Sequence, residues 1–111
     1  MTAATLVRDA PLAHLRWGHG ARMAVLLHGI GGGRAAWDDA LSGTGAALAA
    51  AGLSAVAVDL PGYGESPLIE PYDMAGLAAA VVGLIEWLQP PACALVGHSM
   101  GGMVALEVMA R

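Results

Sequence analysis

The sequence predicts an α/β fold with three layers, in which a mostly parallel sheet carries helices on both faces. Three short apolar runs, Met23–Leu27, Ser54–Val58 and Ala92–Val96, have the length and composition of strands buried on both faces. Helix-like segments lie between these runs, and a glycine or proline follows each run closely. Strands that alternate with helices indicate βαβ units, which pair in parallel through right-handed crossovers.

The first half of the chain opens with a segment of partial alternation, Leu12–Trp17, which we expect to form an antiparallel strand before the parallel ones. After the first apolar run comes a glycine-rich loop, residues 28–33. Helical character follows over Arg34–Leu41 and again over Ala46–Ala51, with a break of small polar residues and glycines between them. Two residues in that break are candidate caps for the second helical piece: Ser42 and Thr44.

The second half contains a proline- and glycine-rich loop, residues 61–67, after the second apolar run. Asp73 is a good N-cap for a helix over Met74–Gln89, and the two prolines at 90–91 end that helix. A last helix is predicted from Met100 onward.

Composition indicates a folded chain with unusually little charge. Of the 111 residues, 57% are apolar and the mean hydropathy is +0.62, which excludes a disordered chain. Charged residues make up 13%, against about 25% in ordinary soluble domains. Either alanine and glycine cover much of the exterior, or more protein covers part of this surface.

Charge and hydropathy also exclude several partners. The net charge is −4 with no basic cluster, so nucleic acid is not an expected partner. The apolar segments Gly45–Val58 and Gly76–Leu88 fall short of the roughly 18–20 residues that a membrane span needs. No secretory leader is visible, so a cytoplasmic location is the default expectation.

Cys93 is the single cysteine, and we expect it to be a small buried hydrophobe.

A G-x-S-x-G pentapeptide, residues 97–101, stands directly after the third apolar run and before the last helix. This arrangement is typical of a strand that enters a sharp turn, holds one serine up and continues as a helix. Gly97 and Gly101 allow the tight turn and the close approach of neighbouring elements. Ser99 is therefore the candidate nucleophile. An ordinary Gly-Ser turn is the alternative interpretation.

The glycine-rich loop at 28–33 offers backbone N–H groups to a developing oxyanion. One donor would be the N–H of Met100, next to the serine, and the other the N–H of Ile30 in the loop. We expect His28 to be structural and to orient the loop together with Gly29. His98 lies within the turn itself, so we do not expect it to act as a base.

Three segments in order resemble successive signatures of the α/β-hydrolase fold family: Leu-Leu-His-Gly-Ile-Gly at 26–31, Asp-Leu-Pro-Gly-Tyr-Gly-Glu-Ser at 59–66 and Gly-His-Ser-Met-Gly-Gly at 97–102. The resemblance implies a serine hydrolase of the esterase or lipase type, with Ser99 as nucleophile and an oxyanion hole from Ile30 and Met100. It implies a small-molecule acyl substrate, no cofactor and a structural role for Asp59. Members that open epoxides or displace halide use aspartate at the nucleophile position. A serine there favours acyl transfer to water from an ester, thioester, lactone, amide or C–C bond, and leaves cofactor-free perhydrolysis open.

The family's catalytic acid and histidine come later in the chain than the serine, as do the lid and the C-terminal strands. All four histidines of this sequence precede or adjoin Ser99. We therefore expect residues 1–111 to be the N-terminal part of a single α/β-hydrolase domain, and we expect no turnover from this fragment alone.

Two alternatives from other classes remain. Gly31, Gly33 and Ala36 fit G-x-G-x-x-A, and Asp59 ends the next strand, as in a dinucleotide-binding βαβ half. A non-catalytic fragment completed by a partner is the other; an unpaired apolar strand at Ala92–Val96 would favour self-association through an exposed sheet edge.

The remaining histidines and the cysteine do not indicate a further site. No cluster has zinc-ligand spacing, so no metal is expected. His14 and His19 have no partner at a suitable spacing and are expected to be exposed loop histidines.

Overall fold

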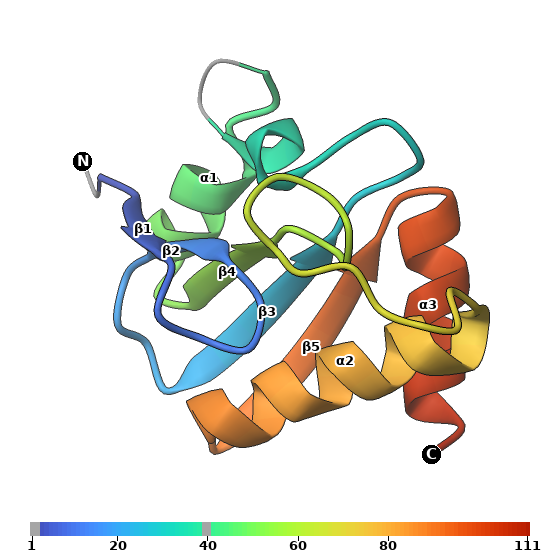
Figure 1. Cartoon of the computed structure of the whole chain (residues 1–111). Helices are drawn as coiled ribbons and strands as arrows, with labels where there is room; N and C mark the ends of the chain where they lie inside the picture. Colours follow the sequence, from blue (N-terminus) through green and yellow to red (C-terminus); the bar gives the residue numbers. More distant parts are fainter. Residues whose placement is uncertain (1–2, 39–40) are drawn as a thin grey trace.

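The computed structural model describes residues 3–38 and 41–111, which form a mixed sheet of five strands with helices on both faces (Figure 1). The strands are β1 (Thr5–Val7), β2 (His14–Trp17), β3 (Arg22–Leu27), β4 (Ser54–Val58) and β5 (Ala92–Gly97). Their order across the sheet is β1-β2-β4-β3-β5. β3 pairs in parallel with both β4 and β5, whereas β2 runs antiparallel to β4 and β1 antiparallel to β2. The predicted fold class is confirmed, and β1 is an additional strand, too short to show a period in the sequence.

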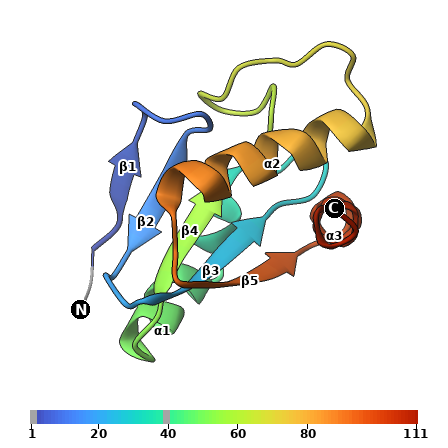
Figure 2. The same cartoon turned by 90° about the horizontal axis from the view of Figure 1, so that it is seen from below.

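The helices are a 3₁₀ turn η1 (Arg34–Trp37), α1 (Thr44–Ala50), α2 (Met74–Leu88) and α3 (Met100–Met109). Figure 2 shows α1 on one side of the sheet and α2 on the other, with α3 beside β5. α3 packs on both α2 and β5. Within the described ranges, no helix has the length and apolarity that crossing a membrane requires.

The sheet buries a different kind of side chain on each face. Val25, Leu27 and Val58 point toward α2 and α3 and belong to the larger core. On the opposite face the strands present small residues such as Ala24 and Ala57, which let α1 lie close. The alternation of side chains along each strand produces this division. Because β3 pairs in parallel with β4 and β5, the carboxyl ends of these three strands lie at one edge of the sheet, where the motif loops emerge.

Two local predictions about the first helices are wrong. The helix predicted over Arg34–Leu41 is a single 3₁₀ turn that ends at Trp37, and residues 39–40 of that prediction lie outside the described residues. It stops because the Asp38 carbonyl accepts the amides of Leu41, Ser42 and Gly43 at 3.0–3.1 Å, which reverses the chain. The N-cap of the helix that follows is Gly43, at φ 67°, rather than Ser42 or Thr44; the Ser42 hydroxyl donates to the Ala36 carbonyl at 2.9 Å and accepts the Thr44 amide at 3.4 Å.

The N-cap prediction for α2 is confirmed. The side chain of Asp73 accepts a hydrogen bond from the Gly76 amide at 2.7 Å, and the helix runs from Met74 to Leu88. The left-handed residue Gln89 then ends it ahead of the two prolines.

Burial of the third apolar run is a further correction. The run forms a strand, as predicted, but five of the six residues of β5 are exposed and Leu95 is half-buried. Cys93, expected in the core, is exposed. The cause is topological: β5 lies at an edge of the sheet, while α1 packs against β4 and β2 on the other side of β3.

His14 is buried, at 1% exposure, rather than lying in an exposed loop. Its Nδ1 is 2.9 Å from the Leu12 carbonyl oxygen, and its ring meets the edge of Trp87 with centroids 6.4 Å apart. Desolvation lowers the pKa of His14 below its ordinary 6.5, and the hydrogen bond to Leu12 offsets this only in part. The folded chain therefore takes up this proton at lower pH than the unfolded chain does.

We expect the stabilising contribution of neutral His14 to be complete above pH 6.5 and to be lost as the pH falls through the lower folded-state value. Urea denaturation between pH 7.5 and 5.5 measures this effect. His14→Gln should flatten the pH dependence, whereas His19→Gln, at an exposed position, should leave it unchanged. Equal slopes for the two variants would contradict the assignment.

Candidate active site

Ser99 follows His98 in the sharp turn that the pentapeptide predicts, between the end of β5 at Gly97 and the start of α3 at Met100. Its backbone has φ 56° and ψ −115°, a left-handed conformation that non-glycine residues rarely adopt. The residue is exposed. The fold thus holds one serine in a strained turn at the carboxyl edge of the sheet.

The two glycines of the pentapeptide are required by packing. A Cβ at Gly97 would lie 2.5 Å from the carbonyl group of Gly101, and a Cβ at Gly101 would overlap the carbonyl group of Leu27 in β3. The His98 amide donates to the Leu27 carbonyl at 3.0 Å, which ties the turn to the end of the neighbouring strand. The serine is therefore presented next to the loop that leaves β3.

That loop, residues 28–33, folds back on itself beside the serine. The Gly32 amide donates to the Gly29 carbonyl at 3.0 Å and closes a tight turn. A Cβ at Gly29 would lie 3.3 Å from the Cβ of Ser99, so the absence of a side chain there allows the approach. Ile30, which is 78% exposed, follows in the same turn.

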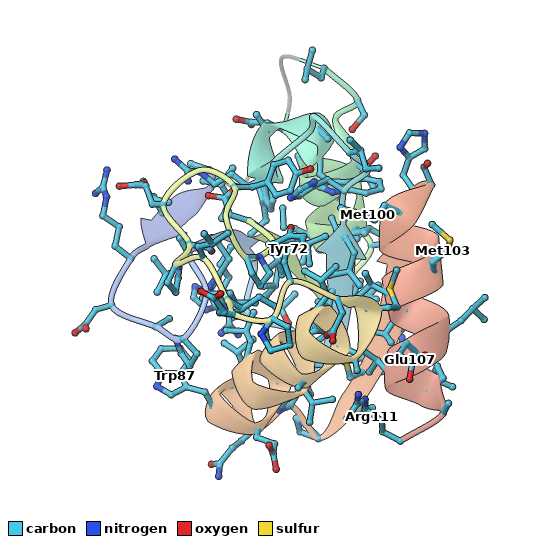
Figure 3. The ribbon with its side chains drawn as sticks, turned by 45° about the vertical axis from the view of Figure 1, so that its right-hand side comes forward. Tyr72, Trp87, Met100, Met103, Glu107 and Arg111 are labelled. Atoms are coloured by element: carbon cyan, nitrogen blue, oxygen red, sulfur yellow. The ribbon has the colours of Figure 1, made fainter. Side chains whose placement is uncertain are left out.

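A cavity of about 310 Å³ lies where the two turns meet. Its lining residues are Gly29, Ile30, Gly31, Gly32, Ala36, His98 and Ser99. Four of the predicted site residues thus meet at one cavity: Gly29, Ile30, His98 and Ser99. Met100 is not among the residues that line this cavity; as the first residue of α3, its amide is one of those that a helix N-terminus leaves without an intrahelical partner. The Met100 side chain is buried in the larger core. Figure 3 shows this residue near the top of α3.

His28 has the structural environment that the sequence predicts. It is fully buried, its Nδ1 is 2.8 Å from the Gly29 carbonyl oxygen, and its Nε2 accepts the Leu60 amide at 3.1 Å. Because Nε2 accepts, the proton is on Nδ1 and the ring is neutral. His28 thereby joins the loop after β3 to the end of β4.

His98 lines the cavity from the turn itself and is exposed. Within residues 3–38 and 41–111, no hydrogen bond connects a histidine ring to the hydroxyl of Ser99.

Asp59 is buried at 1% exposure and is used internally. Its carboxylate accepts the Arg34 amide at 2.8 Å and the Glu65 amide at 3.3 Å, and it forms an ion pair with the Arg34 guanidinium. This guanidinium also reaches Glu65 at 3.1 Å. A carboxylate engaged in this way is not turned toward a ribose, so the structure disfavours the dinucleotide alternative built on Gly31, Gly33, Ala36 and Asp59.

Glu65 completes this network at the surface. Its hydrogen bond with Arg8, at 2.6 Å, is the main reason why the pKa of Glu65 is lowered.

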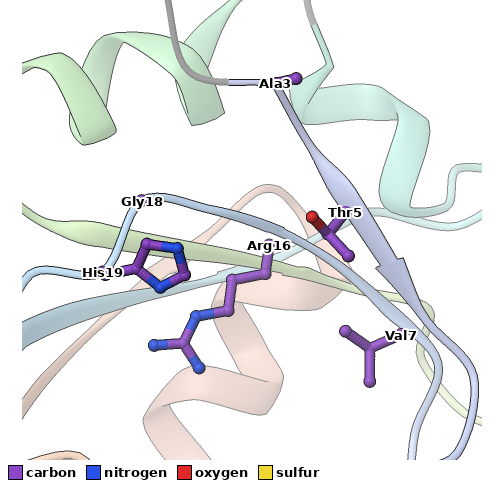
Figure 4. Close-up of a pocket in the computed structure, with 6 residues that line it drawn as sticks. All are labelled: Ala3, Thr5, Val7, Arg16, Gly18 and His19. Carbon is purple, nitrogen blue, oxygen red and sulfur yellow. The ribbon is translucent and has the colours of Figure 1, made fainter.

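Two of the other cavities differ in their relation to the site. One, of about 280 Å³, adjoins the serine: it shares Ala36 and His98 with the first cavity and adds Trp37 and Ser42. The other, of about 140 Å³, lies by the β1–β2 hairpin and contains none of the predicted site residues (Figure 4). Arg16 lines the cavity by the β1–β2 hairpin.

The sequence model of the alpha/beta hydrolase family matches residues 24–111. The chain belongs to the alpha/beta hydrolase family. It is 38% identical over 86 residues to a pimeloyl-[acyl-carrier protein] methyl ester esterase of Neisseria meningitidis, a match that covers 78% of this chain and 30% of the relative. It is 33% identical over 106 residues to an esterase of Mycobacterium tuberculosis, covering 94% of this chain and 33% of the relative.

Solved alpha/beta hydrolases share the fold. An epoxide hydrolase from an endophytic Streptomyces superposes with a TM-score of 0.80 at 29% identity, over 98% of this chain and 33% of that one. The Mycobacterium tuberculosis esterase superposes with a TM-score of 0.78 at 30% identity, over 99% of this chain and 37% of that one. The chain spans about a third of the length of the alpha/beta hydrolases that it matches.

Sequence reasoning did not identify Tyr63 as a residue that contacts the site. The hydroxyl of Tyr63, in the loop after β4, accepts the Gly31 amide at 3.3 Å. Its position inside the 59–66 motif was a usable signal, because β4 and β3 are parallel neighbours and their following loops emerge side by side.

Proposed function

We propose that Ser99 is the nucleophile of a serine hydrolase that cleaves a carboxylic ester or a related acyl bond through an acyl-enzyme. The observation that carries the proposal is the left-handed backbone of Ser99 between β5 and α3, beside a cavity rimmed by the glycine-rich loop. This is the geometry that exposes a serine hydroxyl to a substrate carbonyl. The names of the two relatives, both esterases, support the same chemistry.

In the proposed reaction the Ser99 oxygen bonds to the acyl carbon, and the hydroxyl proton leaves to a histidine base. The carbonyl π electrons move to oxygen, and the N–H groups of Ile30 and Met100 stabilise that oxyanion. A donor of this kind is worth about 3 kcal/mol of transition-state stabilisation. Collapse expels the alcohol, which takes the proton from the base. Water then attacks the acyl carbon and gives a proton to the base, and the Ser99 oxygen leaves with that proton as the carboxylic acid is released.

The histidine base and its carboxylate partner would come from a segment beyond these 111 residues. The relatives are about three times as long as this chain, which leaves ample length for that segment. His98 does not serve as the base in this proposal, because its backbone forms the turn. The fragment alone is expected to turn over no substrate.

The substrate would be a small molecule with an apolar part. The cavity that adjoins the serine is lined by Ala36, Trp37, Ser42 and His98, of which the first two are apolar. The serine also separates this chain chemically from the epoxide hydrolases whose fold it shares, since opening an epoxide to an ester intermediate requires a carboxylate nucleophile. Self-association through the exposed β5 edge, as a partner-completed fragment, stays a prediction.

Covalent labelling with an activated fluorophosphonate tests the proposal. We expect slow addition of one phosphonyl group to the wild-type chain, located at Ser99 by peptide mass spectrometry, because the hydroxyl is exposed but lacks its base. Ser99→Ala should abolish the adduct. Ser54→Ala, at the start of β4 and so at the opposite end of the sheet from the site, should leave the labelling rate unchanged. Absence of label from the wild type, or equal labelling of the Ser99 variant, would refute the role of Ser99.

A further inference from the structure

We propose that Tyr63 is a positioning residue that fixes the loop at 28–33 in the conformation needed to bind an oxyanion. The inference rests on the proposed function, in which the Ile30 amide is an oxyanion donor. It assigns a role to a side chain that does not line the cavity and acts through the loop alone.

Two peptide planes of the loop determine where the Ile30 amide points. The Ile30 N–H and the Gly29 carbonyl share one trans peptide plane and point in opposite directions. That carbonyl is held by the Nδ1–H of His28 at 2.8 Å and by the Gly32 amide at 3.0 Å. The Ile30 N–H is therefore directed away from the buried His28.

Tyr63 holds the following peptide plane and the histidine as well. Its hydroxyl oxygen accepts the Gly31 amide at 3.3 Å, which restrains the plane on the carboxyl side of Ile30. Its ring meets the imidazole of His28 edge to face, with centroids 4.7 Å apart and planes at 68°. Ile30 thus lies between two peptide planes that both depend on side chains anchored outside the loop.

The anchor is itself rigid. The Tyr63 amide donates to the Leu60 carbonyl at 2.9 Å, and its own carbonyl accepts the Ser66 amide at 3.0 Å. The flanking residues Gly62 and Gly64 have φ values of 81° and 52°, and a Cβ at Gly64 would overlap the carboxylate of Asp59. This turn, fixed to the end of β4, holds the tyrosine in place against the neighbouring loop.

The test compares Tyr63→Phe, which keeps the ring and loses the hydroxyl, with Tyr72→Phe as a matched control. The Tyr72 hydroxyl donates to the Pro61 carbonyl at 2.8 Å and has no contact with the 28–33 loop among the hydrogen bonds of the described residues. The first readout is the rate at which the Gly31 amide proton exchanges with water, measured by NMR. We expect Tyr63→Phe to raise this rate up to about tenfold, the value of one hydrogen bond. Amides of β3 should be unaffected in both variants.

The second readout is the rate of fluorophosphonate labelling at Ser99. We expect Tyr63→Phe to slow it several-fold while its urea midpoint stays close to that of Tyr72→Phe. Unchanged Gly31 exchange, or a labelling rate equal to that of the control, would overturn the positioning role. Failure of the wild-type chain to label would instead refute Ser99 as nucleophile, and the Gly31 exchange rate would then decide the tyrosine contact by itself.

Discussion

Gly101→Ala is expected to destabilise the fold by about 3 kcal/mol, because the new methyl group must displace rigid backbone. A Cβ at this position would lie 2.5 Å from the carbonyl carbon of Leu27 and 2.7 Å from the carbonyl oxygen of His28. Leu27 is the last residue of β3 and His28 follows it, and β3 pairs with β4 on one side and β5 on the other, so these groups cannot move without disturbing both neighbours. Urea denaturation followed by far-UV circular dichroism measures the loss.

Gly102→Ala is the matched control for that variant. It lies one residue later in the same helix, and a Cβ there meets its nearest neighbour, the Gly97 carbonyl oxygen, at 3.6 Å, an ordinary contact. We expect this variant to be as stable as the wild type or slightly more stable, since alanine favours helix by up to about 1 kcal/mol over glycine. Similar losses in the two variants would show that close packing of α3 on β3 is not the cause.

Asp59→Asn is expected to destabilise the chain by about 3 kcal/mol, because it leaves a partly buried guanidinium without its main counter-charge. The Asp59 side chain is 2% exposed and its Arg34 partner is 24% exposed, so solvent screens the pair only in part. The carboxylate also holds two backbone amides, at Arg34 and Glu65. The same urea denaturation assay measures this variant.

Glu65→Gln is the control for the ion pair. Glu65 contacts the same guanidinium at 3.1 Å from an exposed position, where solvent screens the interaction. We expect no measurable shift of its urea midpoint. A midpoint lowered as far as in Asp59→Asn would mean that the network acts as one unit rather than through the buried carboxylate.

The sequence predicted the elements that local pattern determines. The run Ser54–Val58 is a strand with those bounds, and the helix after Asp73 starts where its cap places it, because strand length and N-cap chemistry are local properties. The turn at Ser99 was predictable for the same reason, since Gly97 and Gly101 mark positions where neighbouring backbone comes too close for a side chain.

Features that depend on the spatial order of the strands could not be predicted. The composition of Ala92–Val96 matches that of the buried strands, and its exposure follows only from the place of β5 beyond β3. The burial of His14 likewise depends on Trp87, from a helix distant in sequence. The hydrogen bond between the Gly31 amide and the Tyr63 hydroxyl joins the loops that follow two parallel strands, and the spacing of these residues in the sequence does not predict it.

The left-handed backbone at Ser99 has an evolutionary consequence. Such a conformation costs a non-glycine residue on the order of 1–3 kcal/mol, and glycine adopts it almost freely. A descendant released from any need for the hydroxyl would gain thermal tolerance by a single replacement with glycine. Random mutation would therefore tend to replace this serine by glycine unless the hydroxyl contributed to fitness.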